Sequence, residues 1–239
     1  RLTVPADPAR TGYTFAGWTP TVPDTIPAFD MTITAQWTPI TYTISYELAG
    51  GALAEGVTNA ATYTIESEAI TLAEPTKTGY TFAGWTGTGL TKATKNVTIA
   101  KGSIGDRTYT ATWTVNQYTM TFVLGNGEAD VVKTQDYNSA LTAPVPTKTG
   151  YTFKGWSPDV PAMTPASDLS FTAQWERNSY LLKFVADGVS IKEESVLYEG
   201  EIVQPEDPQK EGYTFTGWTP EVAETMPAQD VTYTAQFTV

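Results

Sequence analysis

Two groups of side chains in this sequence have the chemistry to bind a ligand. The 239-residue chain contains seven tryptophans, and large amphipathic rings of this kind can stack on the faces of sugars. The second group is Lys92, Lys95 and Lys101, which lie close together within residues 87–101. We treat these three lysines as the candidate ligand-binding residues.

The residues that usually carry catalysis and metal binding are largely missing. The chain has no Cys and no His, which removes the thiol nucleophiles, the commonest general base and the usual zinc and copper ligands. The close carboxylates Glu66 with Glu68, and Glu193 with Glu194, are interpreted as solvated strand faces. No calcium loop, phosphate loop or Gly-x-Ser-x-Gly elbow occurs. We therefore predict no catalytic residue, no metal site, no cofactor and no enzyme activity.

The charge balance argues against two classes of partner. The net charge is −12 and the pI is about 4.4, whereas nucleic-acid binding depends on cationic side chains. The same charge disfavours anionic membrane surfaces. No apolar run approaches the roughly 18 residues of a membrane helix, so no membrane insertion is expected in this segment. No signal peptide or anchor signal is recognisable; if the protein is secreted, we expect them outside the sequence shown.

Every tryptophan occupies a repeated position, which favours a role in the fold over a role in binding. The heptapeptide Gly-Tyr-Thr-Phe-x-Gly-Trp occurs four times, at residues 12–18, 79–85, 150–156 and 212–218. A proline and a basic residue precede each copy, and a strand ending in Ala-x-aromatic closes it. Internal repetition at intervals of about 60 to 70 residues indicates tandem modules.

The elements that position these aromatics are predicted to be β-strands. Residues 42–48 alternate apolar and polar side chains, and the same alternation recurs from residues 118 and 180 and along residues 31–37. Alternation with a period of two, in β-branched and aromatic residues, is typical of half-buried strands. We predict a mainly β fold, α+β at most. The predicted modules are residues 1–38, 39–115, 116–177 and 178–239.

Within each module the motif aromatics are predicted to form the core. Tyr and Phe of the motif flank one residue and so share one face of a strand, and burial of a large aromatic ring contributes about 3 kcal/mol. Stacking on a ligand is the alternative role for the tryptophans. The predicted core positions are Tyr13, Phe15, Trp18, Trp37, Tyr80, Phe82, Trp85, Trp113, Tyr151, Phe153, Trp156, Trp175, Tyr213, Phe215, Trp218 and Phe237.

The links between modules are short and uniform. The distance in sequence from a closing Trp to the next opening Tyr is the same at Trp37, Trp113 and Trp175, and the links contain no Gly. Such links leave little room for a flexible tether, so we expect an elongated, semi-rigid rod in which each module contacts mainly its neighbours. Residues 1–38 supply only the second half of a module, and we expect them to be stabilised by the next copy or by a partner strand.

These motifs resemble the internalin B-repeat, also called the Listeria–Bacteroides repeat. The resemblance covers nearly the whole chain, and residues 42–113 are similar to a longer variant. It implies small β-grasp modules, like ubiquitin and SUMO, in a bacterial cell-surface or secreted protein, often a Gram-positive adhesin. It carries over no catalytic residue, and partners vary within the family.

Two functions stay open on this basis. The first is a non-catalytic extracellular spacer or stalk, whose partners are neighbouring repeats of the same chain. The alternative is an adhesive module that binds a host or envelope glycan or protein. The insertion at residues 87–101, present in the second copy alone, carries Lys92, Lys95 and Lys101 and is the candidate ligand-binding segment under the alternative.

Overall fold

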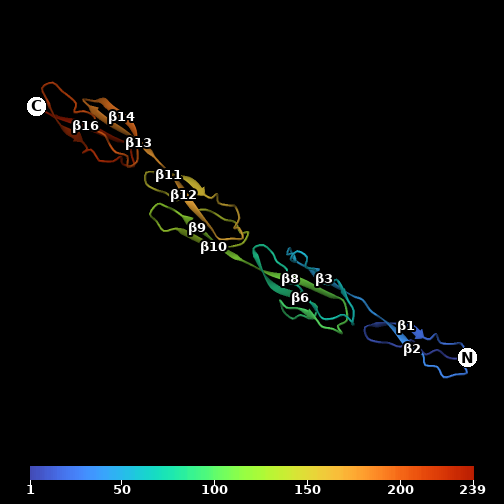
Figure 1. Cartoon of the computed structure of the whole chain (residues 1–239). Helices are drawn as coiled ribbons and strands as arrows, with labels where there is room; N and C mark the ends of the chain where they lie inside the picture. Colours follow the sequence, from blue (N-terminus) through green and yellow to red (C-terminus); the bar gives the residue numbers. More distant parts are fainter. The chain divides into compact units, whose positions relative to one another are not determined.

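The computed structural model describes the whole chain, Arg1–Val239, as sixteen strands without a helix (Figure 1). The chain divides into two compact units, Arg1–Asn116 and Gln117–Val239, and each unit is described by itself. The prediction of a mainly β fold is confirmed, and none of the helical turns that the prediction allowed is present. It follows that no helix is long and apolar enough to cross a membrane.

The second unit contains two four-stranded sheets with the same topology. The first has the order β10-β9-β12-β11 and the second the order β14-β13-β16-β15. In both, the first two strands pair antiparallel, the last two pair antiparallel, and the first and last strands lie parallel in the middle. The strands are β9 (Gln117–Val123), β10 (Val131–Asp136), β11 (Tyr151–Ser157), β12 (Leu169–Arg177), β13 (Ser179–Ala186), β14 (Val189–Leu197), β15 (Thr214–Thr219) and β16 (Val231–Thr238).

The first unit contains one sheet of this type and two smaller ones. The four-stranded sheet has the order β4-β3-β8-β6, again with its first and last strands parallel in the middle. Two further strands, β5 and β7, pair only with each other, and β1 pairs with β2. The strands are β1 (Tyr13–Thr19), β2 (Thr34–Pro39), β3 (Tyr42–Glu47), β4 (Thr62–Tyr63), β5 (Ile70–Thr71), β6 (Tyr80–Gly87), β7 (Thr98–Ile99) and β8 (Arg107–Val115).

A one-residue bulge explains how the motif places two rings on one face. Phe153 and Trp156 are three residues apart, so a regular strand would point them to opposite faces. In the pairing of β11 with β12 the register shifts between Phe153 and Gly155, and the extra residue returns the Trp to the face of the Phe. The ring centroids then lie 5.4 Å apart, edge to face. The same shift and the same contact occur in β1, β6 and β15.

Each four-stranded sheet packs its own core on one face. In the third copy the buried hydrophobic cluster consists of Met120, Phe122, Leu124, Leu141 and Phe171, of which three come from the opening strand or its end. In the fourth copy Leu182, Phe184 and Tyr233 occupy matching strand positions. The cores are therefore built around the two central parallel strands.

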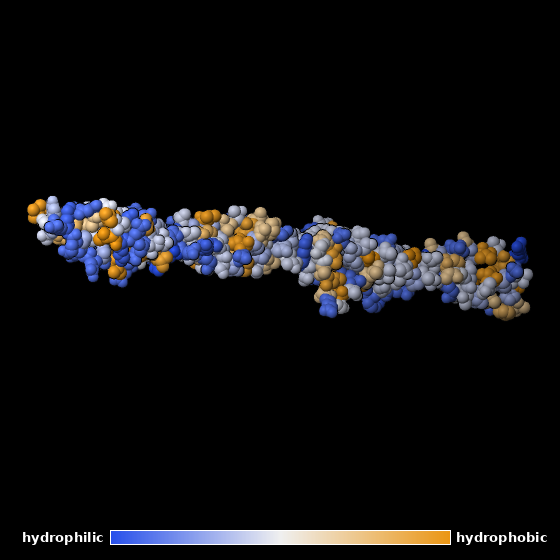
Figure 2. Space-filling view, turned by 90° about the horizontal axis from the view of Figure 1, so that it is seen from above, coloured by the Kyte–Doolittle hydropathy of each residue, from blue (hydrophilic) through white to orange (hydrophobic).

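Residues 1–38 have no comparable core. They form the two-stranded sheet of β1 and β2, and several apolar side chains are exposed, including Ile26 (76 %) and Phe29 (66 %). Apolar surface is visible near the N-terminus in Figure 2, where the rest of the visible face mixes apolar and polar atoms. An isolated pair of strands is at best marginally stable, so this segment is the least supported part of the first unit.

Candidate functional site

A basic side chain stacks on the motif tyrosine in all four copies. The charged group lies 3.9 Å from the ring centroid of Tyr13 for Arg10 and 4.3 Å from that of Tyr80 for Lys77. Lys148 and Lys210 repeat the arrangement on their own tyrosines at 4.5 and 4.6 Å. The backbone N–H of each tyrosine also donates to the carbonyl of the basic residue. This short turn fixes the cation over the ring, where cation–π attraction contributes about 0.5–1 kcal/mol at an exposed site.

The same basic side chain reaches the turn after the opening strand. Lys77 Nζ donates to the carbonyl of Ala49 at 2.9 Å, and Lys148 Nζ donates to the carbonyl of Gly125 at 2.9 Å. In the fourth copy Lys210 forms an ion pair with Asp187 at 2.7 Å, and this hydrogen bond raises the pKa of Lys210. The lysine thus ties the motif to the first hairpin, which is a structural role.

The closing aromatic completes the cluster. Trp113 donates its indole N–H to the carbonyl of Leu48 at 3.1 Å, and Trp175 donates to that of Leu124 at 2.9 Å. The ring of Phe82 lies between the rings of Trp85 and Trp113, 5.5 and 5.6 Å away. Since the closing indole has partners within the module for both its N–H and its ring, it is held mainly by the fold.

The predicted core aromatics differ in their burial. Phe82 and Trp85 are 7 % and 0 % exposed, whereas Tyr213 is 45 % exposed. All the other predicted core positions are half-buried. Tyr213 departs from the core position predicted for it because the motif tyrosine lies at the end of the module, where its burial depends on contacts with the copy that follows. Tyr151, at the equivalent place, is covered further by Tyr198 of the next copy, with ring centroids 5.9 Å apart.

The junction between the third and fourth copies is bonded at its backbone. The N–H of Asn178 donates to the carbonyl of Gly150 at 2.9 Å, and the N–H of Tyr198 donates to the carbonyl of Asn178 at 2.8 Å. Thr152 also donates to the side-chain oxygen of Asn178 at 2.6 Å. Gly150 is buried here, and a Cβ on it would lie 2.1 Å from the ring of Tyr198. Only glycine fits this contact.

A similar junction follows the first motif. The N–H of Ile40 donates to the carbonyl of Gly12 at 2.9 Å, and a Cβ on Gly12 would lie 2.6 Å from Ile65 of the second copy. Tyr13 donates its hydroxyl hydrogen to Glu66 at 2.8 Å. This hydrogen bond raises the pKa of Tyr13 above its ordinary value. The leading glycine and tyrosine of the motif therefore contact the neighbouring copy.

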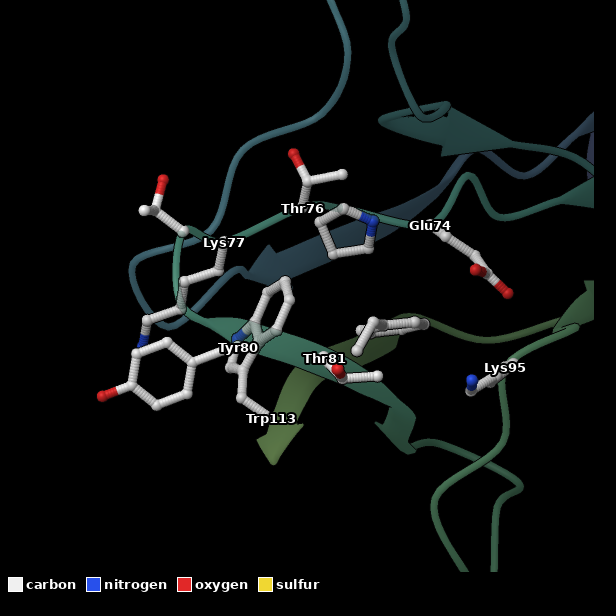
Figure 3. A pocket seen from close by; sticks show the side chains of 10 residues that line it. Glu74, Thr76, Lys77, Tyr80, Thr81, Lys95 and Trp113 are labelled. Atoms are coloured by element: carbon white, nitrogen blue, oxygen red, sulfur yellow. The ribbon is translucent and has the colours of Figure 1, made fainter. Parts of the chain in front are cut away.

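A groove of about 600 Å³ lies beside the second motif, and it involves one of the three candidate lysines. Its walls include Glu74, Lys77, Tyr80, Lys95 and Trp113. Figure 3 shows Lys77 and Tyr80 at one end of the groove and Glu74 and Lys95 at the other. The groove therefore combines aromatic surface with two cationic groups and one carboxylate.

The structure does not bring the three candidate lysines together in this groove. Lys95 lines it, but Lys101 is paired with Glu68 at 2.5 Å and Lys92 is exposed away from its walls. The surrounding sequence is nevertheless unusual, because residues 75–105 contain four lysines and no acidic residue in a chain of net charge −12. A groove in the fourth copy shares the matching proline and closing aromatic, Pro208 and Phe237, but its other walls differ and carry Asp187 and Glu206 without a lysine.

An aspartate that the sequence analysis did not single out occupies the same place in every complete copy. Asp106, Asp168 and Asp230 precede the last strand, and each accepts a hydrogen bond from a backbone N–H of the opening strand at 2.7–2.8 Å. The bond from Thr43 lowers the pKa of Asp106. The recurring spacing between this aspartate and the closing aromatic was the signal available in the sequence. No group of three or more acidic side chains is placed to hold a metal ion.

Comparison with known proteins gives one family and several relatives. The family model described as the Listeria-Bacteroides repeat domain matches residues 1–36, 42–111, 118–174 and 180–239. Internalin H of Listeria monocytogenes is 35 % identical over 142 residues, which cover 51 % of this chain and 25 % of that protein. Two proteins of Evansella cellulosilytica, whose names provisionally class them as membrane proteins, are 32 % and 30 % identical. Their matches cover 79 % and 91 % of this chain, but only 29 % and 27 % of the relatives.

Proposed function

Because this chain belongs to the Listeria–Bacteroides repeat family, we propose that it is a non-catalytic spacer of a bacterial cell-surface protein. The relatives' names, an internalin and two proteins classed as membrane proteins, support a place at the cell surface. The chain spans less than a third of the length of these relatives. In this proposal, it holds other parts of a longer protein away from the cell envelope.

The proposal includes the finer description of the fold. The modules are residues 1–38, 39–115, 116–177 and 178–239, and the complete ones are helix-free versions of the β-grasp fold. The order of strands supports this, because in each complete copy two antiparallel pairs of strands are joined through a central parallel pairing. The copies follow one another as a semi-rigid rod.

The observation that carries the spacer proposal is the bonded junction. Asn178 is held by both neighbouring copies, since it donates to Gly150, accepts from Thr152 and accepts from Tyr198. Burial of the leading glycine removes the space in which the link could swing. A link restrained in this way supports a fixed orientation of one module relative to the next.

Small-angle scattering together with ¹⁵N relaxation of the full chain tests the spacer. We expect an elongated monomer whose third and fourth copies tumble with one correlation time, because their junction is bonded. If the two modules of about 60 residues tumbled independently, each with the correlation time of a free small domain, the proposal would be contradicted. A compact particle would also contradict it.

A second function, binding of an anionic glycan, is favoured by one observation. Lys95 lines the groove of the second copy together with Tyr80 and Trp113, and neither Lys92 nor Lys95 forms a salt bridge. Aromatic surface suits sugar rings, and free ammonium groups attract carboxylate, sulfate or phosphate. We propose this as the adhesive alternative to a pure spacer.

The test compares heparin, hyaluronan and polyglycerol phosphate with neutral dextran as immobilised probes. If the groove binds, the chain is retained on an anionic polymer, retention falls with added salt, and Lys95→Ala, which removes the candidate lysine that lines the groove, strongly reduces it. The matched control is Lys154→Ala, which makes the same charge change in the third copy at a lysine already paired with a glutamate. Equal losses in the two variants, or no retention on any anionic polymer, would exclude the groove.

A further inference from the structure

The chain enters and leaves each complete copy through neighbouring strands. In the third copy it enters at the start of β9 and leaves at the end of β12, and these two strands lie side by side (Figure 1). They run parallel, with Met120 opposite Leu169 and Val123 opposite Thr172. The outer strands β10 and β11 each pair with only one of them.

This arrangement determines how tension along the chain acts on the copy. A pull on both ends draws β9 toward its N-terminus and β12 toward its C-terminus. Because the strands are parallel, the two forces are opposed along their common direction, and the copy is loaded in shear. Bonds of a parallel ladder are evenly spaced, so the four residue pairs from Leu169 to Thr172 share the load. The outer strands carry little of it until the central pair separates.

Two further contacts hold the same pair of strands. Asp168, just before β12, accepts the backbone N–H of Thr119 in β9 at 2.7 Å, and a hydrogen bond to a carboxylate is stronger than one between neutral groups. On the core face the rings of Phe122 and Phe171 stack with centroids 5.1 Å apart, and neither ring is exposed. Sliding of the strands therefore breaks the ladder, the carboxylate bond and the ring contact together.

The fourth copy repeats this construction with different side chains. The central pairing runs from Leu182 opposite Val231 to Val185 opposite Thr234, and Asp230 accepts from the N–H of Leu181 at 2.8 Å. In the second copy Asp106 makes the equivalent bond beside the pairing of β3 with β8. The shared element is thus the link between first and last strands.

We propose that this central parallel pair is a mechanical clamp, which makes each complete copy a load-bearing unit that resists unfolding under tension. The inference rests on the proposed spacer function, because a spacer anchored at one end and attached at the other carries force along its length. It adds a property that a rigid rod does not by itself require.

Single-molecule force spectroscopy with two pulling directions tests the clamp. The chain has no cysteine, so introduced pairs give unique attachment points at exposed residues. Gln117→Cys with Arg177→Cys loads the third copy in shear. Gln117→Cys with Asp136→Cys separates a facing pair of β9 and β10 and opens that hairpin one pair at a time. Since shear loads four pairs together, we expect at least about a twofold higher unfolding force.

A side-chain variant checks the same idea without changing the direction of pulling. Asp168→Ala removes one of roughly five links between β9 and β12, so the shear force of the third copy falls by about a fifth, while the force for opening the hairpin is unchanged. Asp159→Ala is the control, because it removes one exposed carboxylate from the same copy. We expect it to leave both forces unchanged.

The clamp is overturned if the two pulling directions give equal forces, or if Asp159→Ala weakens the shear direction as much as Asp168→Ala. These outcomes are independent of the spacer test. Scattering and relaxation report on the junctions between copies, whereas the ratio of the two forces reports on strands inside one copy. A rigid rod with no excess shear force therefore refutes the clamp alone.

Discussion

Replacement of Gly150 by alanine tests the docking of the third copy against the fourth. Gly150 has a positive φ of 77°, and an added Cβ would lie 2.1–2.5 Å from three ring atoms of Tyr198. Those atoms belong to a ring that stacks against Tyr151. The ring must move away, and the hydrogen bonds of Asn178 at this junction weaken with it.

The chain contains a matched control for this substitution. Gly212 begins the motif of the fourth copy with a φ of 80°, but a Cβ added to it would have no atom of another segment within 4 Å. Alanine in this left-handed conformation costs about 1–2 kcal/mol at either position. Overpacking adds about 1–3 kcal/mol at Gly150 alone. The difference between the two variants thus isolates contact between copies from backbone strain.

Hydrogen exchange at individual amides is the appropriate assay, because a chain of several modules does not unfold in two states. The amides of Asn178 and Tyr198 form the junction bonds. In Gly150→Ala we expect them to exchange about 5- to 150-fold faster than in the parent chain, which corresponds to about 1–3 kcal/mol. In Gly212→Ala they should be unchanged. Unchanged exchange in Gly150→Ala, or equal acceleration in both variants, would refute the reasoning.

Three further predictions concern the stability of individual copies. Trp85→Ala removes a fully buried ring and should destabilise the second copy by about 3–5 kcal/mol, measured by denaturant unfolding followed at amides of that copy. The lowered folded-state pKa of Asp106 means that its bond to Thr43 stabilises the fold above the ordinary aspartate pKa. That contribution is lost as the pH falls through the lowered value, so protection of the Thr43 amide should decrease with acid, and Asp106→Asn should remove this dependence. Finally, amides of residues 1–38 should exchange faster than those of residues 178–239 in the isolated monomer, and equal protection would contradict this.

The strands and the tandem repeat were predictable from local sequence, because alternation and motif spacing are properties of short segments. Residues 42–48 illustrate this: their alternation predicted a strand, and β3 is present there. The family was predictable for the same reason, and the family model confirms it. The bulge at Gly155 was not predictable in this way, since a shift of register exists only relative to a partner strand.

The contacts between distant residues explain the remaining differences. Tyr213 was predicted as core from its place beside Phe215 on one face of a strand, yet the module end leaves it exposed. The structural role of Asp168 was not predictable from local sequence, because its partner, the N–H of Thr119, is distant in sequence. The candidate lysines were grouped by nearness in sequence, but Lys95 lines the groove while Lys101 bonds to Glu68. Pairing between distant segments is the information that local patterns lack.

The parallel pairing of first and last strands also has a consequence for synthesis on the ribosome. β9 cannot meet β12 until the last strand of its copy has been translated, so each sheet closes late and through contacts of high sequence separation. Until then the hairpin of β9 and β10 has an unpaired edge along β9. The opening strands differ in sequence, as residues 42–46 and 180–184 show. Such differences would favour pairing of each nascent hairpin with the closing strand of its own copy. Folding in the order of translation, one copy at a time, follows from this topology.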